Sequence, residues 1–285
     1  MKWSHISQEV KAKQKTQYRR VEFVLASKST MESSSLPTIK SQSSSSELVE
    51  DAISGPNPGL CSPQSLLPYL HWNQILKTSQ GLYNQGNTCY LNSILQCLLH
   101  IPLLSQYILN SSSSNPTTST RTIFDIYQKF VIEYWNNTSR KALSPRLLYQ
   151  NIRRIGKHLR PARQEDAHEF LRLLLDCIHE EILKAKGIKS SPNNVKLQNT
   201  TLICRMFGGY LRNELCCSLC DYKSRTYNLF QDLQLDLNFT SVQSSFSHFV
   251  KPETLDRGNE WFCEKCNKKV KVLLKLLFIA RSHII

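Results

Sequence analysis

Two Cys-x-x-Cys pairs constrain the fold of this chain more than any other feature of its sequence. They are Cys217-Ser-Leu-Cys220 and Cys263-Glu-Lys-Cys266. Four thiolates complete the tetrahedral shell of a Zn²⁺ ion and leave no coordination position open, so a zinc ion held here would be structural and not catalytic. The alternative is two unrelated pairs of free cysteines. If the pairs share one ion, the fold must bring them together.

The 42 residues between Cys220 and Cys263 exceed the spacing of common zinc ribbons. Within them, apolar and polar residues alternate strictly from Leu233 to Phe239, which predicts a strand with one buried face. Apolar residues return to helical spacing from Val242 to Val250, and the segment from Val270 to Ile285 is apolar and β-like. A strand, a helix and a return strand would let the two pairs meet at the tip of an extended hairpin.

The segment Gly81-Leu-Tyr-Asn-Gln-Gly-Asn-Thr-Cys-Tyr-Leu-Asn-Ser93 places Cys89 where a turn gives way to a helix. Apolar residues then recur on one helical face, at Leu91, Ile94, Leu95, Leu98 and Leu99. The positive end of a helix dipole stabilises the thiolate form of a cysteine at this position, which favours a nucleophile. Asn84 carries a side-chain amide that can donate to a developing oxyanion. The alternative for Cys89 is a half-buried structural cysteine.

Composition divides the chain into a tail and a folded part. Residues 1–62 are rich in serine and carry scattered basic residues, with few aromatic residues and no sustained period, which predicts a disordered tail. Residues 63–285 are predicted to form the folded part. Its strongest helical pattern covers Gln164 to Lys184.

Charge and cysteine usage bear on the compartment and the partners. The chain has 36 Lys and Arg against 22 Asp and Glu, a formal net charge of +14. This balance suits acidic partners or a nucleic-acid-rich compartment, but no RNA-recognition or DNA-reading motif indicates direct contact with nucleic acid. No secretory signal or membrane span is apparent, and the ten cysteines indicate metal ligands or catalysis before disulfides. We expect the nucleus and/or the cytoplasm, and no membrane partner.

These motifs together resemble those of the ubiquitin-specific proteases (USPs), a family of deubiquitinating cysteine proteases. The segment around Cys89 is similar to the cysteine box of that family, and Arg163-Gln-Glu-Asp-Ala-His-Glu-Phe170 is similar to its second box. Phe207-Gly-Gly-Tyr-Leu-Arg212 and the first cysteine pair resemble the entry into its zinc-bearing fingers. The resemblance covers about residues 65 to 285. It implies an α+β, papain-like fold with a helical thumb at about 81–187, β fingers at about 200–285 and an incomplete palm.

The resemblance also implies roles for individual residues. Cys89 would be the nucleophile and Asn84 the oxyanion donor, with one structural Zn²⁺ on the four paired cysteines and no cofactor for catalysis. Gln164, Asp166 and Glu169 would face the C-terminal tail of ubiquitin. That tail is rich in arginine, and carboxylates form charge-assisted hydrogen bonds with guanidinium groups. The alternative role of the two carboxylates is to complement the dipole in the first turn of a helix.

The chain departs from the family pattern in its histidines. A thiol protease needs a base and a group that orients the base. In this family both lie in a later segment, around a Gly-His-Tyr-like sequence followed by Asn or Asp. The eight histidines of this chain lack that context; they are His5, His71, His100, His158, His168, His179, His248 and His283. We therefore expect a C-terminally truncated catalytic domain without its general-base segment.

Two functions are compatible with these observations. The first is a thiol-dependent deubiquitinase that cleaves the isopeptide bond after the C-terminal glycine of ubiquitin, with ubiquitin and ubiquitinated proteins as partners. The alternative is a catalytically inactive protein that binds ubiquitin, or a zinc-stabilised interaction protein.

Overall fold

The computed structural model describes residues 59–73, 80–114, 121–139, 141–189, 194–256 and 258–280. The predicted serine-rich tail therefore lies almost entirely outside the described residues. They fall into two compact units, of which the smaller comprises residues 235–251 and the larger comprises the remainder. No helix within these ranges combines the length and the apolar character that crossing a membrane requires.

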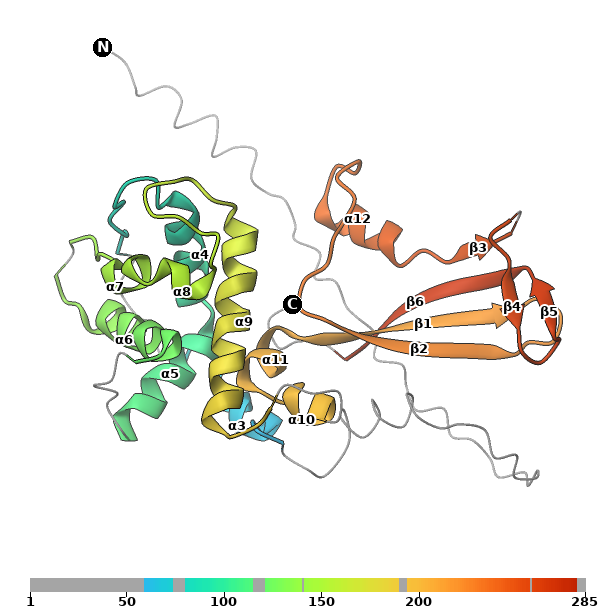
Figure 1. Cartoon of the computed structure of the whole chain (residues 1–285), viewed down its shortest axis with the longest axis horizontal. Coiled ribbons are helices and arrows are strands. Elements are labelled where there is room, and N and C mark those ends of the chain that lie inside the picture. Colours follow the sequence, from blue (N-terminus) through green and yellow to red (C-terminus); the bar gives the residue numbers. More distant parts are fainter. Residues whose placement is uncertain are drawn as a thin grey trace, which may run out of the picture. The chain divides into compact units, whose positions relative to one another are not determined.

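Helices form the first part of the larger unit (Figure 1). They are α3 (Pro63–Leu66), the 3-10 helix η1 (Leu67–Tyr69), α4 (Cys89–Leu99), α5 (Pro102–Ser114), α6 (Ile123–Asn136), α7 (Arg146–Gln150), α8 (Ile152–Ile155), α9 (Ala167–Ala185), α10 (Val195–Gln198) and α11 (Leu202–Phe207).

Helix α4 forms as the apolar spacing predicts, because one face of it is buried in the main hydrophobic core. Leu91, Leu95 and Leu99 are fully buried there. Burying a leucine side chain stabilises a fold by about 2 kcal/mol. The same core includes Phe170 of α9, whose ring meets that of Tyr90 edge to face at a centroid distance of 5.6 Å. The helix that begins at Cys89 is thus packed directly on α9.

Helix α9 begins later than the sequence pattern predicts, at Ala167 and not at Gln164. The carboxylate of Asp166 accepts a hydrogen bond from the backbone amide of Glu169 at 2.8 Å, and Asp166 is therefore the N-cap. Gln164 lies in the loop before the helix. The capping alternative for Asp166 is confirmed.

Helix α6 is attached to α9 by its own capping groups. Thr122 and Asp125 form a capping box at its start. The carboxylate of Glu181, on α9, accepts hydrogen bonds from the amides of Ile123 and Phe124, both at 2.8 Å. Because these amides have no partner within their own helix, the contact fixes the start of α6 against α9.

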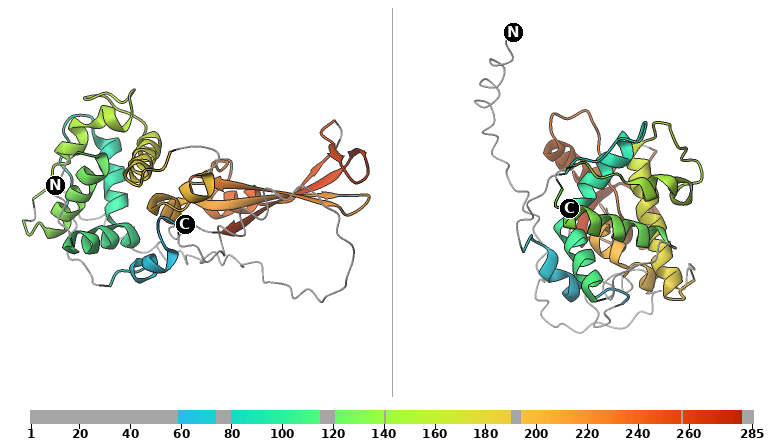
Figure 2. Two further views of the ribbon diagram at one scale, coloured as in Figure 1. Left: turned by 60° about the horizontal axis from the view of Figure 1, so that its bottom comes forward. Right: turned by 90° about the vertical axis from the view of Figure 1, so that its left-hand side faces the viewer.

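The second part of the larger unit is antiparallel β structure. Its strands are β1 (Gly209–Cys217), β2 (Lys223–Phe230), β3 (Glu253–Leu255), β4 (Trp261–Cys263), β5 (Lys268–Val270) and β6 (Val272–Ala280). One sheet has the order β2-β1-β6-β3, and β4 and β5 form a second sheet. In the first sheet Leu215 lies opposite Ser224 of β2 and Leu274 of β6. The three long strands form a ribbon whose far end carries β4 and β5 (Figures 1 and 2).

The strand predicted over Leu233–Phe239 is wrong. No strand occurs among these described residues, and the side chain of Leu237 is 94% exposed. An alternating pattern is not sufficient, because a strand is stable only when a second strand pairs with its backbone. The predicted short helix is confirmed as α12 (Val242–Phe249), which lies in the smaller unit. The predicted β-like end is confirmed as β5 and β6, while residues 281–285 lie outside the described residues.

Candidate active site and cysteine cluster

Cys89 is the first residue of α4, and its side chain is exposed. The turn before it contains two residues with positive φ, Gly86 at 92° and Asn87 at 57°. Glycine adopts this left-handed region at no steric cost, and asparagine tolerates it. Among the described residues, no side chain forms a hydrogen bond with the Cys89 thiol. The local sequence therefore presents a thiol at a helix N-terminus, open to an incoming group.

The side chain of Asn84 organises this turn through its oxygen. Oδ1 accepts hydrogen bonds from the amide of Gly86 at 3.0 Å, and from the amide and hydroxyl of Thr88 at 3.2 and 3.0 Å. Thr88 is buried and directly precedes Cys89. The Nδ2 group of Asn84 has no hydrogen-bond partner among the described residues, and the residue is exposed. One amide thus orders the turn with its oxygen and keeps a free donor on its nitrogen.

Contacts with distant segments fix the turn in place. The amide of Tyr83 donates to the carbonyl of Leu143 at 2.8 Å, and the amide of Leu143 donates to Gly81 at 3.0 Å. The side chain of Asn87 donates to the carbonyl of Ala162 at 2.9 Å. The sequence analysis missed these partners because they lie about 60 to 75 residues away and involve backbone groups, which carry no signature in the sequence.

The second predicted group lies at the start of α9, next to the ring pair that joins α4 and α9. Gln164 is exposed in the loop, Asp166 caps the helix, and Glu169 forms an ion pair with His158, Oε1 to Nε2 at 3.1 Å. A further pair joins His168 to Asp232 at 3.0 Å. The sequence missed both histidine pairs, since nothing in the local pattern relates residues 11 to 64 positions apart.

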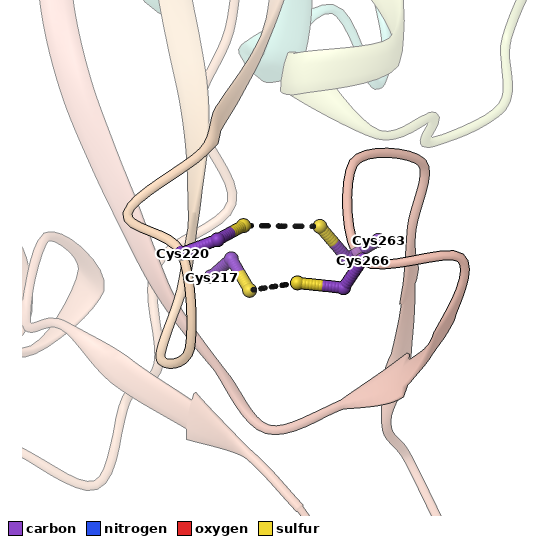
Figure 3. A group of neighbouring side chains, drawn as sticks. All are labelled: Cys217, Cys220, Cys263 and Cys266. Carbon is purple, nitrogen blue, oxygen red and sulfur yellow. Dashed lines mark hydrogen bonds between the residues drawn. The ribbon is translucent and has the colours of Figure 1, made fainter.

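The four paired cysteines converge at the far end of the ribbon. Figure 3 shows Cys217 and Cys220, from the turn between β1 and β2, facing Cys263 and Cys266, from the turn between β4 and β5. Their sulfur atoms all lie within 4.8 Å of one another. The Sγ atoms of Cys217 and Cys266 are 3.8 Å apart, and those of Cys220 and Cys263 are 3.7 Å apart. These distances are far longer than a disulfide bond of about 2.05 Å.

The geometry of the cluster fits a tetrahedral metal ion. Four sulfurs at a Zn–S distance of about 2.3 Å form a tetrahedron with edges of about 3.8 Å, which is the separation observed. Burial raises the pKa of the Cys217 thiol, but the amide of Leu219, which donates to its Sγ at 3.4 Å, lowers it, and the resulting pKa is about 7. A thiolate is therefore accessible here near neutral pH, as a metal ligand requires.

The sequence of this chain is similar to a known family. A family model described as ubiquitin carboxyl-terminal hydrolase matches residues 80–280. The chain is 34% identical over 204 residues to a Schizosaccharomyces pombe protein named probable ubiquitin carboxyl-terminal hydrolase 16, which covers 70% of this chain and 44% of that protein. It is 32% identical over 234 residues to human ubiquitin carboxyl-terminal hydrolase 42, which covers 80% of this chain and 17% of that protein. The chain spans less than half the length of these relatives.

Solved structures give the same result for the fold. The chain is similar to the SAGA Ubp8/Sgf11/Sus1/Sgf73 DUB module bound to ubiquitin aldehyde, with a TM-score of 0.58 and 27% identity over 72% of this chain and 45% of that chain. The same module with a substituted Ubp8, bound to monoubiquitin, matches with a TM-score of 0.58 and 26% identity over 72% and 46% of the two chains. The predicted α+β, papain-like fold of the USP type is confirmed.

Proposed function

The chain belongs to the ubiquitin carboxyl-terminal hydrolase family of cysteine peptidases, and on this premise we propose that it supplies the nucleophile of a thiol-dependent deubiquitinase. The observation that carries the proposal is the turn from Asn84 to Cys89. It presents an exposed thiol at the N-terminus of α4 beside an amide whose Nδ2 group is free to donate.

The proposed reaction is acyl transfer from the C-terminal glycine of ubiquitin. The thiolate of Cys89 attacks the glycine carbonyl carbon, and the carbonyl oxygen becomes an oxyanion to which Nδ2 of Asn84 donates. When the C–N isopeptide bond breaks, the lysine amine leaves with a proton, and water then hydrolyses the thioester. No histidine of the described residues forms a hydrogen bond with the Cys89 thiol, and we propose that the base and its orienting group come from a segment outside them.

Three residues are proposed to recognise the tail of ubiquitin. Gln164, Asp166 and Glu169 lie together around the first turn of α9, and both carboxylates suit the arginines of that tail. Two observations support the assignment. The rings of Tyr90 and Phe170 pack next to Cys89 and Glu169, and the similar solved modules are described as bound to ubiquitin aldehyde and to monoubiquitin.

The cysteine cluster is proposed to bind one structural Zn²⁺. Its four sulfur donors match the preferred ligands and the edge length of tetrahedral zinc. The ion would join the turn between β1 and β2 to the turn between β4 and β5. We also propose a location in the nucleus and/or the cytoplasm, where thiol ligands stay reduced. Expression of a fluorescently tagged full chain tests that location.

The second candidate function is ubiquitin binding without turnover. It is favoured by the way the recognition group is built, because Asp166 and Glu169 are held by the cap of α9 and by His158 and not through Cys89. A protein of this kind would bind ubiquitin with the same affinity whether or not Cys89 is present.

An electrophilic ubiquitin probe tests the proposal. A ubiquitin that carries a C-terminal propargyl amide should form an adduct with the chain, detected as a mass increase of one ubiquitin. Cys89→Ala should abolish the adduct, whereas Cys97→Ala, which removes another exposed cysteine of the same helix, should leave it unchanged. For this chain alone we expect no measurable cleavage of a fluorogenic ubiquitin substrate.

The outcomes separate the candidates. An adduct that persists in Cys89→Ala would overturn the assignment of the nucleophile. Binding of unmodified ubiquitin without any adduct would favour the second candidate, and absence of both would overturn the two functions together.

A further inference from the structure

A long stretch of the chain carries positive charge without any acidic residue. From Asn136 to Gln164 the sequence contains no Asp or Glu. Of its basic residues, Arg140 lies outside the described residues and the other seven are all exposed. We refer to these seven as the basic surface: Lys141, Arg146, Arg153, Arg154, Lys157, Arg160 and Arg163.

The fold keeps most of this charge in one layer. Helices α7 and α8 follow one another with a single residue between them and lie side by side (Figure 1). The loop after α8 folds back onto α7, because the amide of Ala162 donates to the hydroxyl of Tyr149 at 2.8 Å. Residues that follow α8 are thus returned to the helix that precedes it. The cations of both helices and of the loop lie on neighbouring backbone and share one region of the surface.

The protein does not neutralise this charge internally. Among the described residues, no carboxylate forms a salt bridge with any member of the basic surface. The acidic groups next in sequence are otherwise engaged, since Glu165 accepts from the backbone amide of Arg160 and Glu169 pairs with His158. Arg154 donates to the Arg121 carbonyl and to Asn151, which are neutral acceptors. The charge is therefore available to an anionic partner.

The residue types indicate the kind of anion. Five of the seven cations are arginines, whose planar guanidinium group binds phosphate oxygens in pairs. The surface lacks the apolar anchors that a docked protein segment needs; Leu147, at 40% exposure, is the one large apolar side chain of α7 and α8 that is exposed. Tyr149 is half-buried with its hydroxyl engaged, so the described part of this surface offers no ring on which an unpaired base could stack.

We propose that the basic surface binds the phosphate backbone of double-stranded nucleic acid without reading its sequence. The earlier expectation against direct contact rested on the lack of base-reading motifs, and binding to the backbone needs none. The bond between Asn87 and Ala162 attaches the basic loop to the turn that carries Cys89. A duplex bound here would therefore lie next to the candidate active site. The proposal does not rest on deubiquitination, because binding is measured without ubiquitin.

Fluorescence anisotropy with a labelled DNA duplex of about 20 base pairs and random sequence tests this proposal. The full chain should bind, and log K should fall linearly with log salt concentration between about 50 and about 200 mM. Replacing Arg153, Lys157 and Arg160 by Gln together should lower affinity at least about tenfold and reduce the steepness of the salt dependence by about 3, one for each lost phosphate contact.

The matched control replaces Lys184, Lys186 and Lys189 by Gln, which removes the same charge from exposed positions at and after the end of α9. This variant should lose much less affinity and keep the salt dependence. Circular dichroism checks that both variants fold, and the single change Arg160→Gln serves if the triple variant does not. Equal losses in both triple variants would overturn the proposal in favour of net charge alone. Tight binding of poly-glutamate in place of the duplex would overturn it in favour of an acidic protein segment.

Discussion

At the scale of single residues, the candidate site depends on one amide with two functions. The oxygen of Asn84 accepts three hydrogen bonds that hold the turn before Cys89, while its nitrogen has no partner among the described residues. A structural function belongs to the oxygen and the proposed oxyanion function to the nitrogen. The two can be separated because aspartate retains an acceptor and loses the donor.

Asn84→Asp and Asn84→Ala should therefore differ in stability. The aspartate variant should keep its melting temperature close to wild type, whereas the alanine variant should lose about 1–2 kcal/mol, because the amide and hydroxyl of buried Thr88 lose an acceptor. Both variants should react with the electrophilic ubiquitin probe about 100-fold more slowly or worse. Thermal unfolding and adduct formation over time measure the two effects. Normal reactivity of Asn84→Asp would contradict the oxyanion function.

At the scale of elements, the start of α9 combines a structural and a proposed binding function in Asp166. Its carboxylate caps the helix through the amide of Glu169. Asparagine caps a helix about as well as aspartate but carries no charge, so it preserves the first function and removes the second.

Asp166→Asn should leave stability unchanged and weaken ubiquitin binding about tenfold, because one charge-assisted contact is lost. Asp166→Ala should in addition lower the free energy of unfolding by about 1 kcal/mol. Asp176→Asn, which removes an exposed charge further along α9, is the control. Calorimetric titration with ubiquitin and urea unfolding measure the effects. Equal weakening by Asp166→Asn and Asp176→Asn would assign the effect to net charge.

The ribbon contains a second element-scale feature, a nearly buried carboxylate in the pairing of β1 with β2. Glu214 is 6% exposed and lies directly opposite Arg225, whose Nε donates to Oε2 at 2.8 Å. Arg212 adds a second positive charge at 3.6 Å. Burial raises the pKa of Glu214, but the hydrogen bond and charge of Arg225 and the charge of Arg212 outweigh it, so the pKa lies below its usual value of 4.5.

This shift predicts how stability depends on pH. Because the folded pKa of Glu214 is below the unfolded value, its contribution is fully present above about pH 4.5 and is lost as the pH falls through the folded pKa. Glu214→Gln should lower the free energy of unfolding by about 1 kcal/mol at pH 7, since Arg225 is partly exposed. The difference between wild type and variant, from urea unfolding at pH 7 to 3, should shrink below about pH 4.5. A constant difference would contradict the shift.

At the scale of the whole molecule, the four cysteines join two sheets that share no hydrogen-bonded strand pair. The sheet of β4 and β5 has two strands of three residues each, too little structure to be stable by itself. We therefore expect its stability to depend on the proposed zinc ion, while the helical core around α4 and α9 remains independent of it.

Metal analysis should find about one zinc per chain, and a chelator should release it. Hydrogen exchange should then accelerate in β4, in β5 and in the turn between β1 and β2, with α4 and α9 keeping their protection. Cys220→Ser should reproduce the effect of the chelator, and Cys97→Ser, outside the cluster, should not. Unchanged exchange in β4 and β5 after zinc removal would contradict a structural function.

The sequence by itself determined features that depend on neighbours a few positions apart. The leucine spacing of α4 follows from helical periodicity, and the turn before Cys89 follows from residues that tolerate positive φ. The chemistry of the two Cys-x-x-Cys pairs was also legible, because four thiolates have one preferred use inside cells. These are local properties, and they were sufficient for the family and the fold class.

Only the tertiary structure decided which distant groups meet. It brought the four sulfurs to within 4.8 Å, left residues 233–239 without a strand partner, and joined Asn87 to Ala162. It also gathered cations of α7, α8 and the following loop into one surface. The physical reason is that strand pairing, side-chain contacts to backbone groups and charge clustering depend on the path of the whole chain, whereas helical spacing and turn preferences act within a few residues.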